Sequence, residues 1–192
     1  MPYEMQPIRV AYEGWTRLLV ATIRTPEGET LKREIEEHGD ATAVLPYDPE
    51  RRVAMLVRQF RPPVFHASGE TATLEVPAGL LDEDDPETCA RREASEEVGL
   101  RLAKLEPVTT AWSMPGISAE RIHLFLAPYS VADRTGAGGG AEGEHENITP
   151  SEIPLDELAA MAESGHLTDM KTLALVQTLR LRRPDLFCTE LR

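Results

Sequence analysis

The fold of this chain can be inferred from one stretch, GLLDEDDPETCARREASEEVGL, which covers residues 79–100. Pro86 suits the first position of a helix, because it has no amide hydrogen to leave unpaired. Asp85, just before it, can cap the free amides of the first turn. Gly99 stands where a left-handed residue commonly ends a helix. The stretch therefore predicts a glycine loop followed by a helix between Pro86 and Gly99.

Three glutamates stand near the end of this predicted helix. Glu93 and Glu97 are four residues apart and share one face, which Glu96 borders. Like charges at this spacing repel, and the C-terminal end of a helix disfavours anions. A cation would offset both costs, and carboxylate oxygens without His or Cys partners suit Mg²⁺ or Mn²⁺ rather than zinc. A solvated acidic helix is the alternative interpretation from the spacing alone.

Composition restricts the class of protein. The 192 residues are 41% hydrophobic, enough for a core, and carry a net charge of −13. That charge argues against nucleic acid or an anionic membrane as a partner, since both require a basic surface. Two cysteines are too few for a disulfide scaffold. With neither a signal peptide nor an apolar run of about 20 residues in the sequence, we expect a soluble cytoplasmic protein.

The order of the predicted elements indicates an α/β or α+β domain with a mixed sheet. Residues 64–71 are expected to form an exposed loop. We expect an N-terminal β region over residues 1–40 and the main domain over 41–192. Strands are predicted within residues 8–25, 30–37, 41–47, 53–60, 74–78, 102–112 and 120–129, and further helices within 153–164 and 170–182.

Candidate substrate contacts lie outside the predicted helix. Arg58 and Arg61 flank an aromatic residue at a strand end, and guanidinium groups offer a planar fork of donors to phosphate oxygens. A solvated strand end is the alternative. Residues 134–147 are rich in glycine, lack an apolar anchor and are expected to be mobile. They also concentrate acids, and a loop carboxylate there could act as a general base.

The stretch 79–100 resembles the Nudix box, G-x5-E-x7-R-E-U-x-E-E-x-G-U with U aliphatic. Its second half fits if Ala94 is accepted as aliphatic, but Asp85 replaces the first glutamate and the box is one residue short. This shortening resembles the nucleoside diphosphate sugar branch known as GDP-mannose pyrophosphatases. A proline about 15 residues past the box is also typical of ADP-ribose pyrophosphatases. Further matches are Arg58–Arg61, Met114–Gly116, Ile122–Phe125, the glycine-rich acidic loop ending at Ile148, and Asp169–Thr172.

The resemblance implies a Nudix-type α/β/α sandwich with a mixed sheet, plus a small N-terminal antiparallel β region. It also implies a role for individual residues. The implied metal ligands are the Ala78 carbonyl, Glu93, Glu96, Glu97 and Glu146. The implied catalytic group consists of Glu144 as base, Glu97, and Arg92, which orients the glutamates. The implied substrate contacts are Arg58, Arg61 and Pro115. Glu75 matches a position near the metal site.

The activity implied is Mg²⁺-dependent hydrolysis of a nucleoside diphosphate sugar to a nucleoside monophosphate and a sugar phosphate, with Mn²⁺ as a possible substitute. ADP-ribose and GDP-mannose both remain candidate substrates, and Glu144 and Glu146 could exchange roles. The resemblance further implies a homodimer that exchanges its N-terminal strands. The alternative function is a Nudix-like regulator that binds a nucleotide sugar without cleaving it.

Overall fold

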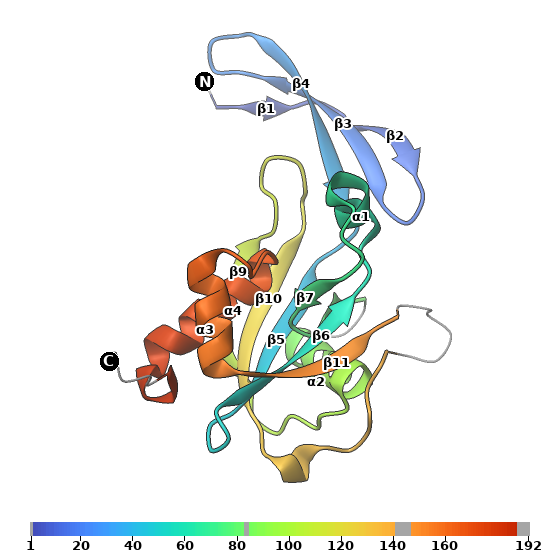
Figure 1. Cartoon of the computed structure of the whole chain (residues 1–192). Coiled ribbons are helices and arrows are strands. Elements are labelled where there is room, and N and C mark those ends of the chain that lie inside the picture. The colour runs from blue at the N-terminus through green and yellow to red at the C-terminus, as the bar shows by residue number, and fades with distance from the viewer. Residues whose placement is uncertain (1, 83–84, 141–146, 188–192) are drawn as a thin grey trace. The chain divides into compact units, whose positions relative to one another are not determined.

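The computed structural model describes residues 2–82, 85–140 and 147–187, which fall into two compact units (Figure 1). The first unit comprises Met1–Asp40 and Ala111–Ile122. The second comprises Ala41–Thr110 and His123–Arg192.

A four-stranded antiparallel sheet lies in the N-terminal part of the first unit. Its central strand is β3, and β4 pairs along the whole of it, from Arg17 opposite Glu37 to Arg24 opposite Thr30. β1 and β2 follow one another along the other edge of β3. The strands predicted within residues 8–25 and 30–37 are present. The bounds are β1 Glu4–Met5, β2 Arg9–Glu13, β3 Arg17–Arg24 and β4 Thr30–Glu37.

A larger sheet of seven described strands runs through the second unit, in the order β11-β6-β5-β10-β9, with β7 paired to β6 and β8 to β5. Its strands are β5 Ala41–Asp48, β6 Val53–Gln59, β7 Thr73–Glu75, β8 Ala78–Leu80, β9 Glu106–Trp112, β10 Arg121–Pro128 and β11 Thr149–Pro154. The helices are α1 Pro62–Ser68, α2 Pro86–Val98, α3 Leu155–Ser164 and α4 Met170–Arg182, with 3-10 turns at Val131–Asp133 and Pro184–Phe187.

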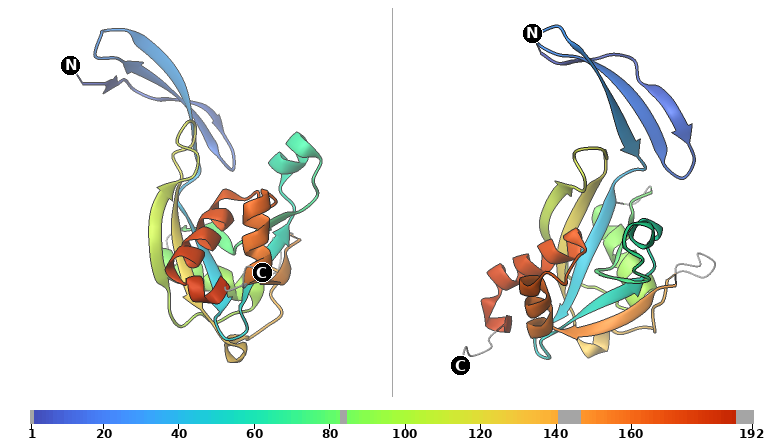
Figure 2. Two further views of the ribbon diagram at one scale, coloured as in Figure 1. Left: turned by 60° about the vertical axis from the view of Figure 1, so that its left-hand side comes forward. Right: turned by 45° about the horizontal axis from the view of Figure 1, so that its top comes forward.

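Helices cover both faces of this sheet, with α2 on one side and α3 and α4 on the other (Figures 1 and 2). The middle strand β5 is buried along its whole length. Because side chains alternate along a strand, Val44 packs towards α2 while Ala43 and Leu45 lie on the opposite face. On that face α4 buries Leu175 and Leu179 completely. The expected α/β fold is thereby confirmed.

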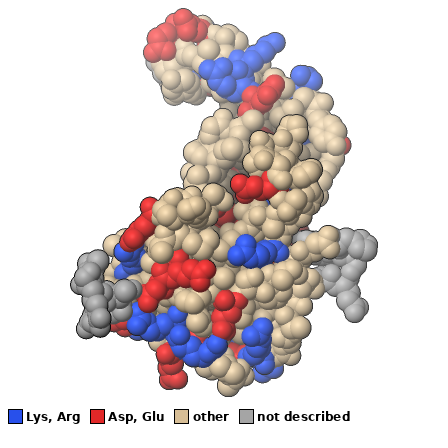
Figure 3. Space-filling view, in the orientation of Figure 1, with Lys and Arg blue, Asp and Glu red and all other residues tan. Residues whose placement is uncertain are grey.

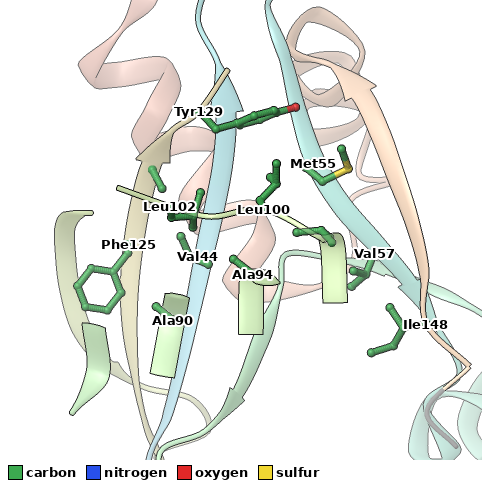
Figure 4. Close-up of a cluster of buried hydrophobic side chains, with 12 residues drawn as sticks. Val44, Met55, Val57, Ala90, Ala94, Leu100, Leu102, Phe125, Tyr129 and Ile148 are labelled. Carbon is green, nitrogen blue, oxygen red and sulfur yellow. The ribbon is translucent and has the colours of Figure 1, made fainter. Parts of the chain in front are cut away.

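A cluster of buried hydrophobic side chains forms the contact between α2 and the sheet (Figure 4). Ala90 and Ala94 on α2 lie against larger residues of β5 and β6, among them Val44, Met55 and Val57. The small alanines let the helix approach the sheet closely, and these five side chains have about 1% exposure or less. This packing fixes the position of the helix that carries the three glutamates.

Two elements differ from the sequence-based expectation. The loop expected at 64–71 is wrong over most of its length, because α1 occupies Pro62–Ser68, begins with proline in its first turn and ends at Gly69 with φ 79°. The strand β11 was not predicted, yet it pairs with β6 from Thr149 opposite Arg58 to Pro154 opposite Val53. Its prolines are tolerated because β11 is an edge strand.

Among the described residues, no helix combines the length and the apolar character that a bilayer crossing requires. In Figure 3, the visible face of the second unit shows acidic and basic side chains intermixed. Surface ion pairs of this unit include Arg183 with Asp185 at 2.9 Å and Arg91 with Glu87 at 3.2 Å.

Candidate active site

Both ends of α2 are built as the sequence predicts. The Asp85 carboxylate accepts hydrogen bonds from the backbone amides of Glu87 at 3.0 Å and Thr88 at 3.1 Å, and the Thr88 hydroxyl also donates to it. These bonds, the Thr88 hydroxyl foremost, lower the pKa of Asp85. Gly99 ends the helix in the left-handed region, with φ 66°. The residue that departs from the Nudix pattern, Asp85, therefore serves as the helix cap.

Glu93 and Glu97 are both buried and both lie against β8. The backbone amide of Ala78 donates to Glu97 Oε2 at 3.2 Å. The Glu93 carboxylate lies beside Gly79, so closely that a β-carbon there would come within 2.1 Å of Glu93 Oε1. The residues are 9% and 3% exposed. Burying two carboxylates on one helix face is costly unless each is compensated by donors or cations.

Arg92 is one source of that compensation. Its Nη1 lies 2.8 Å from Glu93 Oε1 and 3.3 Å from Glu96 Oε2. Its Nη2 donates to the carbonyl of Leu80 at 3.4 Å, which anchors the guanidinium to the end of β8. The structure thus places Arg92 among the glutamates.

Arg61 makes a two-pronged ion pair with Glu75. Its Nε and Nη2 donate to the two oxygens of Glu75, both at 2.9 Å. Burial opposes the charge on Arg61, but the bonds to Glu75 outweigh it and raise the pKa of Arg61, with the charges of Glu97 and Asp169 adding to the effect. The Arg61 side chain keeps 42% exposure. Glu75 therefore holds one edge of the Arg61 guanidinium, and part of the side chain stays accessible to a ligand.

A second cation, Lys171, was not singled out from the sequence. Its Nζ contacts the buried Glu75 carboxylate and lies 2.9 Å from Asp169, the N-cap residue of α4. The Thr172 hydroxyl accepts from the backbone amide of Val76 at 2.8 Å. Burial would raise the pKa of Glu75, but the bonds from Arg61 and the charge of Lys171 lower it. One signal existed in the sequence, since a lysine in the first turn of a helix is disfavoured without an acidic partner.

The remaining predicted site residues are Arg58, Pro115, Glu144 and Glu146. Arg58 is an exposed residue of β6. Pro115 is an exposed residue of the first unit, in the loop between β9 and β10. Glu144 and Glu146 lie outside the described residues, as does Glu142. The structure therefore brings together Ala78, Arg92 and the three box glutamates, with Arg61 and Glu75 nearby.

Backbone hydrogen bonds hold the described residues 134–140 of the glycine-rich segment, whose composition suggests a mobile loop. Up to Gly140 its backbone packs on the end of α2, where the amides of Gly139 and Gly140 donate to the carbonyls of Glu97 and Glu96 at 2.9 and 3.1 Å. A run of glycines can make such contacts without any apolar side chain, so composition alone does not reveal them.

The donors at this site are oxygens, which fits Mg²⁺ or Mn²⁺. Glu93 and Glu97 present buried carboxylates next to the backbone of β8. In the part of the chain that the structure describes, no three His, Cys, Asp or Glu side chains stand close enough to enclose an ion by themselves. A cation here would complete its coordination with backbone oxygen, water or substrate phosphate, as Mg²⁺ commonly does.

The chain is similar to known proteins both in sequence and in fold. Residues 37–174 match the family model described as NUDIX domain. The sequence is 40% identical over 159 residues to a GDP-mannose pyrophosphatase of Cronobacter sakazakii, covering 81% of this chain and 82% of that protein. It is 39% identical over 149 residues to a GDP-mannose pyrophosphatase of Citrobacter koseri, covering 77% of each. The fold is similar to a solved "ADP compounds hydrolase", with a TM-score of 0.77 over 95% of each chain at 15% identity.

Proposed function

Because the chain belongs to the Nudix family of hydrolases, we propose that it cleaves the diphosphate bond of a nucleoside diphosphate sugar, with GDP-mannose as the first candidate. The products would be a nucleoside monophosphate and a sugar phosphate. Relatives at 39–40% identity that bear the name GDP-mannose pyrophosphatase support this choice. The structural neighbour at 15% identity supports only the fold.

The observation that carries the proposal is the burial of two carboxylates, Glu93 and Glu97, side by side against the backbone of β8. With Glu96 and the Ala78 carbonyl, and with Glu146 from outside the described residues, they would hold Mg²⁺ or Mn²⁺. When bound, such an ion polarises phosphoryl oxygens and lowers the pKa of water.

The cations around the glutamates have separate tasks. Arg92 balances the charges of Glu93 and Glu96 and restrains their side chains. Arg61 presents the guanidinium edge that Glu75 does not use, and we assign it to the phosphates of the substrate. Arg58 and Pro115 are further candidate substrate contacts. Glu144 is the candidate base that takes a proton from the attacking water.

A panel of nucleotide sugars assayed with Mg²⁺ and Mn²⁺ tests the proposal. We expect the highest kcat/KM for GDP-mannose, with ADP-ribose as the comparison, and release of the nucleoside monophosphate. Glu97→Gln should remove turnover while leaving the circular dichroism spectrum unchanged. Binding of a nucleotide sugar without its cleavage would favour the regulator, and preference for a nucleoside triphosphate would overturn the substrate class.

We also assign the N-terminal β region, residues 1–40, to homodimer formation, with N-terminal strands exchanged between subunits. Its described sheet exposes large apolar side chains, which is unusual for a surface that stays in water. The exposed fractions are Tyr3 69%, Met5 58%, Ile8 44%, Val10 41%, Tyr12 59% and Trp15 77%.

Light scattering after size-exclusion chromatography tests this assignment. The wild type should have the mass of a dimer, and Val10→Asp combined with Tyr12→Asp should give a monomer. Leu181→Asp is the matched control, because Leu181 is 83% exposed on α4 and lies outside the first unit. A monomeric wild type would remove the assignment.

A further inference from the structure

Two backbone segments far apart in the sequence run side by side at the end of α2. The first is the helix end and the residues after it, 96–101, and the second is the segment 133–140. The amide of Arg101 donates to Asp133 O at 2.9 Å, and the amide of Thr135 donates to Gly99 O at 2.8 Å. The amides of Gly139 and Gly140 donate to the carbonyls of Glu97 and Glu96. Hydrogen bonds therefore connect the two segments along their length.

Glycine at two positions makes this approach possible. A β-carbon on Gly138 would lie 2.3 Å from the carbonyl oxygen of Glu97 and 2.7 Å from the Cα of Val98. A β-carbon on Gly99 would lie 2.3 Å from the carbonyl oxygen of Gly136. Both obstacles are backbone atoms of the facing segment, so they cannot move aside as a flexible side chain could.

These hydrogen bonds pair carbonyl groups at the C-terminal end of α2. The last carbonyls of a helix have no partner within it. Gly99 and Leu100 supply the first two donors from the chain itself, to Ser95 O and Ala94 O. The carbonyls of Glu96 and Glu97 accept hydrogen bonds from Gly140 and Gly139 of the second segment. Without this segment, the turn that carries the acidic cluster would lack these two hydrogen bonds.

We infer that the run Gly138–Gly140 is a positioning element for the metal site, and that Gly138 is the residue on which it depends. It holds the backbone of Glu96 and Glu97 against the repulsion between their carboxylates and that of Glu93, so that the carboxylates keep their direction before a cation arrives. The inference rests on the proposed function, since it takes Glu97 as a ligand. Outer partners that orient ligands typically affect metal affinity about 10- to 100-fold.

The test compares Gly138→Ala with Gly165→Ala. The two glycines have nearly the same backbone conformation, with φ 73° and 76°, but a β-carbon on Gly165 would meet no atom within 4 Å. Both substitutions carry the cost of a left-handed alanine, and only the first one collides with Glu97. Mn²⁺ affinity, measured by the electron paramagnetic resonance signal of free Mn²⁺, should fall about 10- to 100-fold in Gly138→Ala and stay within about twofold of wild type in Gly165→Ala.

A second variant separates backbone strain from collision. Asparagine tolerates the left-handed region but still has a β-carbon, so Gly138→Asn should lose Mn²⁺ affinity as Gly138→Ala does. If both variants bind Mn²⁺ like Gly165→Ala, the inference is overturned. If neither variant folds, hydrogen exchange of the wild type decides the question. The amides of Gly139 and Gly140 should then exchange as slowly as those of α2, and fast exchange would contradict the inference.

The outcomes also distinguish this inference from the proposed function. A wild type that binds no Mn²⁺ and cleaves no nucleotide sugar removes the function and the inference together. A wild type that binds and cleaves, with unchanged affinity in the Gly138 variants, removes the inference alone. A large loss of affinity without a matching loss of thermal stability relative to Gly165→Ala supports positioning, because a purely structural role would lower only the stability.

Discussion

The Glu93 carboxylate occupies the space where Gly79 would carry a side chain, with Oε1 2.1 Å from the position of a β-carbon on Gly79. This relationship joins the glycine that opens the Nudix box to a buried glutamate on the helix that follows. It gives the glycine a function other than turning the chain, because its backbone φ is not in the left-handed region.

Gly79→Ala should therefore damage the site and spare the fold. The new methyl group meets the carboxylate end of the Glu93 side chain, which can rotate away, so the melting temperature should change little. The displaced Glu93 carboxylate should lower kcat/KM about 10- to 100-fold. Gly136→Ala is the control, since a β-carbon there has no neighbour closer than 4.0 Å and the glycine is not left-handed. Equal activity of the two variants would contradict the prediction.

Glu75→Gln should lower both stability and substrate affinity. Removal of this charge leaves Arg61 and Lys171 without their shared buried partner, and breaking a buried ion pair costs about 3 kcal/mol. Urea unfolding measures this loss, and a raised KM would report the released Arg61. Glu163→Gln removes the exposed pair with Arg180 and should cost less than about 1 kcal/mol. A similar loss of unfolding free energy in the two variants would contradict the prediction that the buried ion pair contributes more stability than the exposed one.

The stability that the Glu75 carboxylate contributes should depend on pH in the acid range. Because the folded pKa of Glu75 is below its ordinary value of 4.5, its contribution is complete above that value and is lost as the pH falls through the folded pKa. The difference in unfolding free energy between wild type and Glu75→Gln should therefore be constant near neutral pH and shrink below about pH 4.5. Unfolding curves collected between about pH 3 and 7 measure it. A constant difference throughout would be the contrary result.

The stability that His38 contributes to the first unit should have the opposite pH dependence and be lost as the pH rises. Its Nδ1 lies 2.5 Å from Glu36 and its Nε2 3.2 Å from Glu120. Burial lowers the pKa of His38, but the hydrogen bond and charge of Glu36, with the charge of Glu120, raise it above 6.5 overall. The stabilisation is complete below pH 6.5 and is lost as the pH rises through the folded pKa.

Trp15 offers a probe for this titration, because its ring stacks on His38 with the centroids 5.0 Å apart. In a Trp112→Phe background, Trp15 is the remaining tryptophan of the sequence. Its fluorescence should titrate with a midpoint above 6.5, and His38→Gln should abolish the titration. His166→Gln, in the connection between α3 and α4, should leave it unchanged. A midpoint at or below 6.5 would contradict the assignment.

The sequence alone was sufficient for the helix α2, for both of its caps and for the family. The helix begins and ends at residues whose effect is local: Asp85, Pro86 and Gly99 act on backbone groups a few positions away. The order of residues in the sequence is therefore enough to predict them. Elements without such signals were missed. α1 is short and has no buried residue to create a periodic pattern, and β11 carries two prolines that disguise an edge strand.

Only the tertiary structure decided which groups meet around the glutamates. Lys171 reaches Glu75 from 96 positions further along the chain, and no spacing rule connects them. The capping of Glu97 by Gly139 is a contact between backbones, so side-chain patterns do not encode it. The sequence by itself determined the chemistry of the acids and the helix that presents them, because these depend on residues a few positions apart. The positions of Arg61, Lys171 and the glycine run depend on the packing of strands and helices around that helix.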